Sequence, residues 1–354
     1  MKRILALVLA VGMVAGALSF RSRIEDAPLA GPGNPPGTAG ELTLTCDVGL
    51  EDVCEAVADE ADVGAVAEAP AAVADRLVDP AGEELRGAWL TLDPWVEVAA
   101  LRLESAGEAT VLGDGTPLAR SPLVAAVWEE RAAALESACG TLTWRCVGDV
   151  AAGSWADIGA PEAWGRVKVG RAEGADAAEA MLLLGQIAAG YAGGGDVSRA
   201  DVEGNAFFAW LSRLEEARPP LPPGLASPIE AMVQRGESAL DIAGVLEAQA
   251  APFLARTAAR APTLRLQPIE PVVTANLVVA AIGDDDGAHA LAEEVARVAP
   301  ALLAEAGWRV EGSPDAPALT QVGVAFPGGL PTEAGLPPAG TLFVLLQLAQ
   351  EVGR

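Results

Sequence analysis

This chain of 354 residues contains few recognisable combinations of catalytic side chains. Its one histidine, His289, begins an alanine-rich stretch and has no neighbouring Cys or acidic HxxE-type partner. A lone histidine leaves Ser and Cys nucleophiles without their usual base, and no GxSxG sequence is present. The glycine run 193–195 lacks the lysine of a phosphate-binding loop and follows a predicted helix, not a strand. Carboxylate pairs are plentiful, but no spacing marks one out, so we predict neither an enzyme nor a cofactor.

The four cysteines fall into two local pairs, Cys46 with Cys54 and Cys139 with Cys146. A metal site would need CxxC-like spacing or histidine partners, and the sequence has neither. In an oxidising compartment each pair can close a small loop. We therefore predict two disulfides and no metal site.

The N-terminus has the composition of an export signal. A cationic start precedes the apolar run Ile4–Leu18, which ends in small residues, as in secretory signals. Arg21 and Arg23 follow closely, as they would flank an uncleaved anchor. We predict that residues 1–23 are a signal peptide or a signal anchor, with both alternatives open, and that the Pro/Gly-rich residues 24–40 are a linker.

The charge balance excludes one class of partner. Asp and Glu total 49 against 23 Lys and Arg, which gives a formal net charge of −26. Such a field repels phosphate backbones, and no basic stripe interrupts it, so nucleic acid is excluded as a partner. The 51% of apolar residues can bury a sizeable core. Membrane contact is expected only through the N-terminal segment.

Strand-like and helix-like patterns alternate along the chain from residue 41. Strands are predicted at 42–46, 63–67, 86–92, 118–128, 264–266 and 271–280. Helices are predicted at 51–61, 70–77, 96–104, 177–191, 199–216, 246–260, 287–306 and 339–352. This alternation predicts an α/β fold with largely parallel sheets.

Six segments between about residues 41 and 310 carry a resemblance through their order and spacing. They are LTLTCDVGLEDVCEAVADEA, RGAWLTLDPWVEVA, LARSPLVAAVWEERAAAL, RVKVGRAEGADAAEAMLLLGQIAAGYAG, RGESALDIAGVLEAQ and LRLQPIEPVVTANLVVA. In this order they resemble the type II periplasmic binding protein fold and, within it, the molybdate-type bacterial extracellular solute-binding proteins.

The resemblance implies two lobes, each a mostly parallel sheet flanked by helices, joined by two crossing strands. The crossings would lie near residues 118–127 and 264–279. Lobe 1 would comprise residues 41–117 with 266–354, and lobe 2 residues 118–265. Ligands in such folds lie in the cleft between the lobes, where helix N-termini present free N–H groups.

The resemblance also implies ligand-binding positions. Ser121 matches a family hydroxyl at the first crossing, while Gly49, with Asp47 beside it, stands where the family places another. A later family loop falls at Asp176, and Ser238 lies close to the last binding loop, where the family's tyrosine has no equivalent. Carboxylates near the cleft would repel a dianion, which argues against molybdate itself.

Each of these positions also has a structural interpretation. Trp95 either stacks on an organic ligand in the cleft or is a half-buried core residue. Ser121 fits a turn at a sheet edge equally well, and Asp176 fits a helix N-cap. Ser238 fits a structural role.

Taken together, these features predict an extracytoplasmic solute-binding protein, secreted or anchored to the outer face of the cytoplasmic membrane. Its lobes would close on a small ligand, an oxyanion or a small organic solute, and a membrane permease of the ABC type would be its partner. The alternative is the same fold with a degenerate cleft, acting as a membrane-anchored surface interaction or assembly protein. An extracytoplasmic hydrolase is a third, more distant hypothesis.

Overall fold

The computed structural model describes residues 42–79, 84–108, 111–172, 177–194, 197–221, 225, 227–327, 329–330 and 336–352. Residues 37–354 form one compact unit. The predicted signal segment, residues 1–23, and the predicted linker, residues 24–40, lie outside the described residues.

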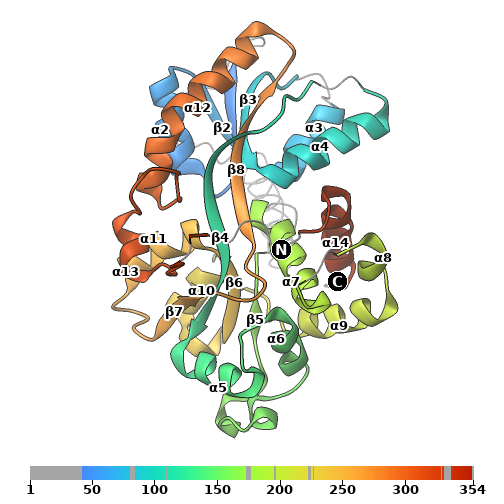
Figure 1. Ribbon diagram of the computed structural model, residues 1–354, viewed down its shortest axis with the longest axis vertical. Helices are drawn as coiled ribbons and strands as arrows, with labels where there is room; N and C mark the ends of the chain where they lie inside the picture. Colours follow the sequence, from blue (N-terminus) through green and yellow to red (C-terminus); the bar gives the residue numbers. More distant parts are fainter. Residues whose placement is uncertain are drawn as a thin grey trace, which may run out of the picture. The chain divides into compact units, whose positions relative to one another are not determined.

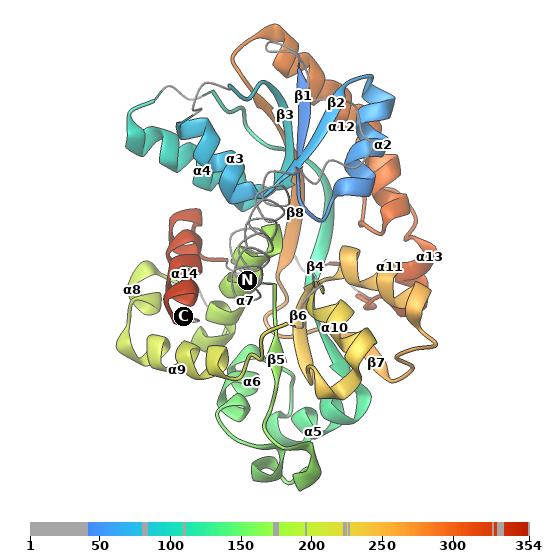
Figure 2. The same cartoon turned by 180° about the vertical axis from the view of Figure 1, so that it is seen from behind.

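Eight strands in the described part of the chain form one continuous sheet system (Figures 1 and 2). Their bounds are β1 Thr43–Asp47, β2 Gly64–Glu68, β3 Gly87–Leu92, β4 Thr116–Trp128, β5 Val169–Gly170, β6 Ile242–Leu246, β7 Leu264–Gln267 and β8 Thr274–Ile282. The order is β2-β1-β3-β8-β4-β6-β5, and β7 pairs with β4 beside this path.

Strand β4 belongs to two sheets in succession. Its first part, Thr116–Pro122, pairs antiparallel with β8, which in turn pairs with β3. From Leu123 onward β4 pairs antiparallel with β6, and from Ala125 also with β7. We call the sheet of β2, β1, β3, β8 and the start of β4 sheet A, and that of the rest of β4 with β5, β6 and β7 sheet B.

The predicted α/β class is confirmed. The sheets are more mixed than the predicted, largely parallel arrangement: β1 is parallel to β2 and β3, and β5 is parallel to β6. The strands that run between the sheets pair antiparallel with their neighbours. The apolar runs of β3 and β6 are buried along their whole length, as expected for central strands.

Helices cover both sheets (Figures 1 and 2). Those on or near sheet A are α2 Glu51–Ala61, α3 Pro70–Val78, α4 Asp93–Ala106 and α12 Asp286–Ala306. Those on or near sheet B are α5 Glu129–Cys139, α6 Trp144–Ala151, α7 Ala178–Ala192, α8 Arg199–Val202, α9 Asn205–Glu216, α10 Pro228–Arg235 and α11 Glu247–Thr257. The 3₁₀ turns are η1 Trp155–Ile158, η2 Glu162–Trp164 and η3 Gly236–Ser238.

Alternation along β4 explains how one strand serves two cores. Leu123, Ala125 and Val127 face the larger core, while Val124, Ala126 and Trp128 face a second one behind sheet B. Successive side chains of a strand point to opposite faces, so an uninterrupted apolar run is what a strand covered on both sides requires.

The C-terminal elements are α13 Pro317–Val322 and α14 Ala339–Val352. Helix α13 packs on α11, and α14 packs on α7, α9 and α4, so α14 touches helices from both sheets. Among the described residues, no helix combines the length and apolar character needed to cross a membrane. The predicted lobe boundaries stay a prediction.

Candidate ligand-binding site

The C-terminal end of β1 holds a carboxylate in a ring of neutral donors. Asp47 is fully buried. It accepts a hydrogen bond from the indole Nε1 of Trp89 at 3.1 Å and one from Oγ1 of Thr91 at 2.6 Å, both on the adjacent strand β3. The parallel register of β1 and β3 brings these side chains to the same end of the sheet.

Burial dominates the acidity of Asp47. It raises the pKa of this carboxyl from 3.8 to about 7, although hydrogen bonds from Thr91, Trp89 and the backbone of Leu92 act in the opposite direction. The carboxylate of Glu179, on the first turn of α7, raises it further. Asp47 therefore changes charge near neutral pH, which is uncommon for an aspartate and typical of functional sites.

Helix α4 connects this strand end to α7. Trp95, in the first turn of α4, is fully buried and donates from its indole Nε1 to the carbonyl oxygen of Ala178 at 2.9 Å. Ala178 is the first residue of α7, so the bond joins a sheet-A helix to the N-terminus of a sheet-B helix. The structure thus places Trp95 close to the predicted cleft but gives its ring no exposed face for stacking on a ligand.

Ser121 lies on β4 where the strand passes from sheet A to sheet B. Its hydroxyl oxygen accepts a hydrogen bond from the backbone N–H of Ala248 at 2.9 Å, and the side chain is buried. Ala248 is in the first turn of α11, so Ser121 satisfies one of the free N–H groups of that helix. The donor that would attract an anionic ligand there is already occupied.

The loop after β1 approaches α11 directly. Gly49 has φ +93°, a conformation that favours glycine, and a Cβ at this position would lie 3.1 Å from Nε2 of Gln249. The backbone N–H of Gly49 donates to the Glu51 side chain at 2.8 Å. The loop is therefore held by its own helix, α2, and lies against the side chain of Gln249.

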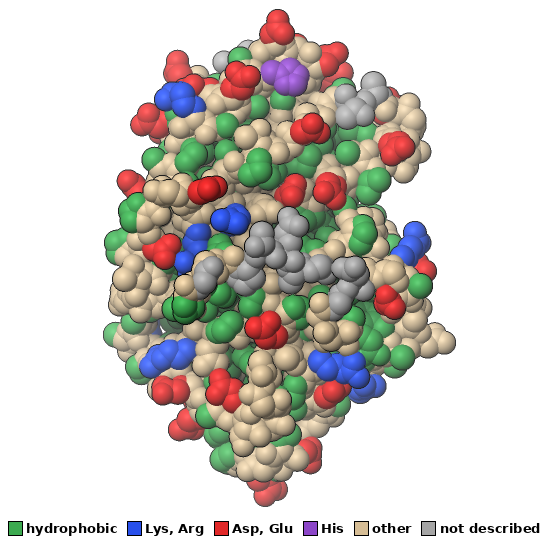
Figure 3. Space-filling view, in the orientation of Figure 1, with side chains coloured by type: hydrophobic (Ala, Val, Ile, Leu, Met, Phe, Trp, Pro, Cys, Tyr) green, Lys and Arg blue, Asp and Glu red, His purple; other side chains and the backbone are tan. Residues whose placement is uncertain are grey.

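These contacts bring four segments together: the C-terminal ends of β1 and β3 and the N-termini of α7 and α11. We call this region the junction. In Figure 3 the outline of the surface is indented beside α4, above α14.

The helix N-termini at the junction carry acids rather than hydroxyls. Burial raises the pKa of Glu179 on α7. Burial and the nearby carboxylate of Asp93 raise the pKa of Glu97 on α4. Asp47 and Glu179 are thus acids of the junction, and Glu97 lies nearby on α4, while at the first residue of α11 the carboxylate of Glu247 pairs with Arg309 at 2.9 Å.

The remaining predicted residues lie elsewhere. Asp176 falls outside the described residues. Ser238 is exposed, donates its hydroxyl to the carbonyl oxygen of Arg235 at 2.7 Å, and lines a separate pocket with Arg235. It lies before β6, whereas the junction follows the end of that strand.

Both predicted cysteine pairs are joined, Cys46 to Cys54 and Cys139 to Cys146, and the described chain holds no free cysteine. The first disulfide ties β1 to α2 directly beside Asp47. Such bonds are typical of proteins that fold outside the cytoplasm. No group of three or more His, Cys, Asp or Glu side chains in the described ranges is arranged to hold a metal ion.

Four residues at the junction were not predicted: Trp89, Thr91, Glu179 and Gln249. Trp89 and Thr91 both lie on β3 and donate to Asp47 on the neighbouring strand β1. Only the register of these two strands reveals that the three side chains meet. Glu179 and Gln249 each fall in the first turn of a predicted helix. A search of helix N-termini for polar side chains would have found both.

Known proteins match this chain by structure but not by sequence. No protein-family model matches the chain, and no curated protein matches it by sequence. Solved structures do match. The apo ferric ion-binding protein A of Pasteurella haemolytica is 14% identical, with a TM-score of 0.58 over 89% of this chain and 98% of that one. The iron- and citrate-bound IdiA (FutA) of Trichodesmium is 12% identical, with a TM-score of 0.55 over 89% and 99%.

The fold is that of the periplasmic substrate-binding proteins. A further match is the periplasmic binding protein AfuA of Actinobacillus pleuropneumoniae with fructose-6-phosphate bound, 12% identical, with a TM-score of 0.52 over 89% of this chain and 98% of that one. The predicted type II periplasmic binding fold is thus confirmed, and the molybdate-type subgroup stays a prediction. At these identities the likeness establishes the fold and not the ligand.

Proposed function

We propose that this chain is an extracytoplasmic solute-binding protein that takes up a small ligand at the junction and delivers it to a membrane permease of the ABC type. The observation that carries the proposal is the convergence of two strand ends and two helix N-termini around a buried, titratable carboxylate, Asp47. In open α/β folds, ligands bind outside the carboxyl ends of strands. The two disulfides and the fold of the structural neighbours support the location and the partner class.

The ligand class follows from the acids at the junction. A dianion would meet Asp47, Glu97 and Glu179 and would find the first turn of α11 already bonded by Ser121. A small organic solute carrying an amine or several hydroxyl groups would instead find carboxylate acceptors. We therefore favour an amine-bearing or polyhydroxyl ligand over the oxyanions, molybdate included.

Closure would take place about β4 and the segment between β7 and β8, as a hinge motion between the lobes at 41–117 with 266–354 and at 118–265. Gln186 of α7 supports this hinge. Its amide donates to the carbonyl oxygens of Leu123 at 3.2 Å and of Pro271 at 3.0 Å, and its oxygen accepts from Nε1 of Trp144 at 3.0 Å. One buried side chain thus holds both crossing segments in register.

A second candidate function has support of its own. The Trp95–Ala178 bond and the close approach of Gly49 to Gln249 fill part of the space between the two sheets. A chain whose junction stays closed in this way would be a degenerate binding fold, acting as a surface interaction or assembly protein. Its anchoring would depend on residues 1–23.

A thermal-shift panel separates the two. The protein would be screened at pH 8 with putrescine, lysine, choline, glucose, sulfate, molybdate and fructose 6-phosphate. A solute binder gains stability as ligand exceeds the Kd, by about 2.7 kcal/mol at one hundred times that concentration. We expect an amine or a sugar to raise the melting temperature. A response to anions alone would overturn the proposed ligand class, and no response together with capture of a protein partner would favour the scaffold.

A further inference from the structure

A pocket lies at the end of sheet B remote from the junction. Its volume is about 330 Å³. One wall is the segment Pro219–Leu221, and the other is formed by Ala239 and Leu240, with Arg235 and Ser238 completing the lining. Leu240 precedes β6, whereas the junction follows its last residue, so the length of the strand separates the two places. This volume suits a small ligand.

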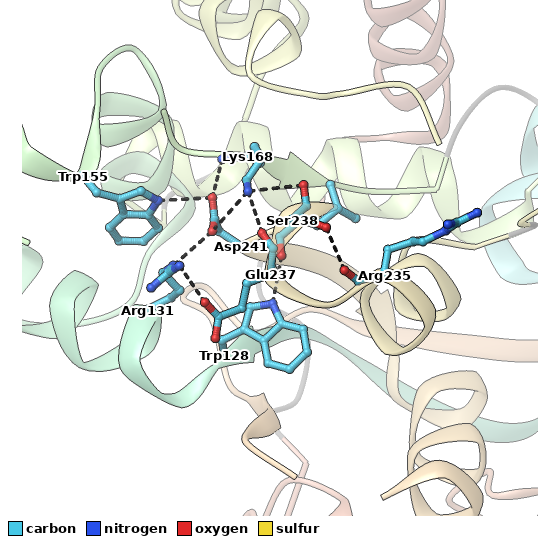
Figure 4. A network of polar contacts seen from close by, with 9 residues as sticks. Trp128, Arg131, Trp155, Lys168, Arg235, Glu237, Ser238 and Asp241 are labelled. Atoms are coloured by element: carbon cyan, nitrogen blue, oxygen red, sulfur yellow. Dashed lines mark hydrogen bonds and ion pairs between the residues drawn. The ribbon is translucent and has the colours of Figure 1, made fainter. Parts of the chain in front are cut away.

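The wall before β6 is held rigidly from behind (Figure 4). Nε1 of Trp128 donates to the carbonyl oxygen of Leu240 at 2.8 Å. Nζ of Lys168 donates to the carbonyl oxygen of Glu237 at 2.5 Å and to that of Ser238 at 3.4 Å. The pocket wall is therefore fixed before any ligand arrives, which lowers the ordering cost of binding.

Behind these bonds lies the fully buried carboxylate of Asp241. It accepts hydrogen bonds from Nε of Arg131 at 3.0 Å, from Nε1 of Trp155 at 3.1 Å and from the backbone N–H of Lys168 at 2.8 Å. The Arg131 guanidinium also pairs with Glu237 at 2.8 Å and stacks 3.4 Å from the ring centre of Trp164. We call Asp241 with these partners the Asp241 cluster.

Arg235 is the charged residue of the described pocket lining. Its exposed guanidinium forms no ion pair or hydrogen bond among the described residues, and Figure 4 shows it pointing away from the Asp241 cluster. Arg131 and Lys168 are not in the pocket lining and pair with Asp241 and Glu237. The described lining therefore combines apolar walls with one charged side chain, an arginine, in a chain whose net charge is −26.

We propose that this pocket binds a small monocarboxylate. The apolar part of this ligand would lie between Pro219–Leu221 and Ala239. Its carboxylate would pair with Arg235, because a planar guanidinium matches the two oxygens of a carboxylate. A free aliphatic acid and the C-terminal residue of a peptide share this chemistry. Neither involves the residues of the junction, so the pocket stands whether or not the proposed solute binding is correct.

The test is a saturation-transfer NMR titration of the full chain with hexanoate, alongside hexanol and hexylamine at equal concentration. We expect hexanoate to bind at least about tenfold more tightly than the alcohol, because a hydrogen bond to a charged partner is worth more than a neutral one, and the amine not to bind. Arg235→Met, which keeps the aliphatic stem, should weaken hexanoate about tenfold, and Ala239→Leu should abolish its binding by filling the pocket.

Arg297→Met is the matched control. Arg297 is an exposed arginine on α12 whose ion pair with Glu294 contributes little to stability, so hexanoate binding should be unchanged. A tripeptide ending in leucine, compared with its C-terminal amide, identifies the source: tighter binding than hexanoate indicates a peptide terminus, and weaker binding a free acid. Equal binding by the Arg235 and Arg297 variants, or equal binding of hexanoate and hexanol, would overturn the proposal.

Discussion

Each sheet region contains one fully buried aspartate whose partners we compare, and the two differ in the charge of the groups that surround them. Asp47 ends β1 and accepts from Trp89 and Thr91, which are neutral donors. Asp241 precedes β6 and also accepts from a tryptophan, but Arg131 neutralises its charge. Both carboxylates are satisfied by hydrogen bonds, and only one is balanced by an opposite charge.

The groups around a buried acid distinguish a structural role from a functional one. A buried charge paired with a guanidinium holds its surroundings together, and losing either partner leaves the other uncompensated. A buried acid among neutral donors has its pKa raised to about 7 and remains able to respond to a cationic ligand or to pH. We therefore propose that Asp241 has a structural role and that Asp47 belongs to the ligand-binding site.

The largest effect should come from breaking the structural partner. Asp241→Asn removes the buried one of the two carboxylates that pair with Arg131, so we expect a loss of about 3 kcal/mol in the free energy of unfolding, measured by urea denaturation. The double variant Asp241→Asn with Arg131→Met should recover part of this loss, because no buried charge remains unpaired. A single variant as stable as the wild type would remove Asp241 from the architecture.

The next effect concerns Asp47 and depends on pH. Because its pKa is raised from 3.8 to about 7, the folded state binds a proton more tightly than the unfolded state. Its contribution is therefore fully present below pH 4 and is lost as the pH rises to 7, by roughly 4 kcal/mol at most. Asp47→Asn should flatten this fall in stability between pH 4 and 8. Parallel stability curves for variant and wild type would contradict the raised pKa.

The two disulfides allow a sharper comparison, because their loops are similar in length, with sequence separations of 8 and 7. By loop closure alone, each should contribute about 2.5 kcal/mol. We expect Cys46→Ala with Cys54→Ala, and separately Cys139→Ala with Cys146→Ala, to lower the melting temperature equally. Only the first pair of substitutions should change ligand binding at the junction, since Cys46 adjoins Asp47. Free thiols in the unreduced wild type would refute both bonds.

The smallest effect is expected at Ser121. Ser121→Ala leaves the backbone N–H of Ala248 without its acceptor and should cost about 1 kcal/mol, measured by thermal unfolding. The matched change Ser238→Ala removes an exposed hydroxyl that bonds only locally and should cost less. If Ser121→Ala instead keeps full stability and abolishes ligand binding, the hydroxyl contacts ligand, as the family resemblance implied.

The fold was more predictable from the sequence than the site. Strand and helix periods located most elements, including the strand at residues 118–128. That this strand crosses between two sheets was implied by the family resemblance and not by its apolar pattern. Pro122 does not interrupt this strand, because it lies at the end of the pairing of β4 with β8. The two disulfides were predictable too, because cysteines seven and eight residues apart can close small local loops, as both pairs do.

The site depends on contacts that no local pattern encodes. Ser121 bonds a residue 127 positions away, and Trp95 one 83 positions away. A hydroxyl or an indole can be recognised as polar and buried from sequence, but its partner is set by how β4, α7 and α11 pack. Ser238 is a further example. The resemblance implied a position close to the last binding loop, but Ser238 lines a different pocket.

Carboxyl NMR can show whether Asp47 is a titratable acceptor at the junction. With ¹³C-labelled aspartate, the side-chain carboxyl carbons would be followed from pH 3 to 9, and Asp47 assigned by the signal missing in Asp47→Asn. We predict that its signal titrates near pH 7, as burial among neutral donors requires. A midpoint near 4 for Asp47 would contradict the account.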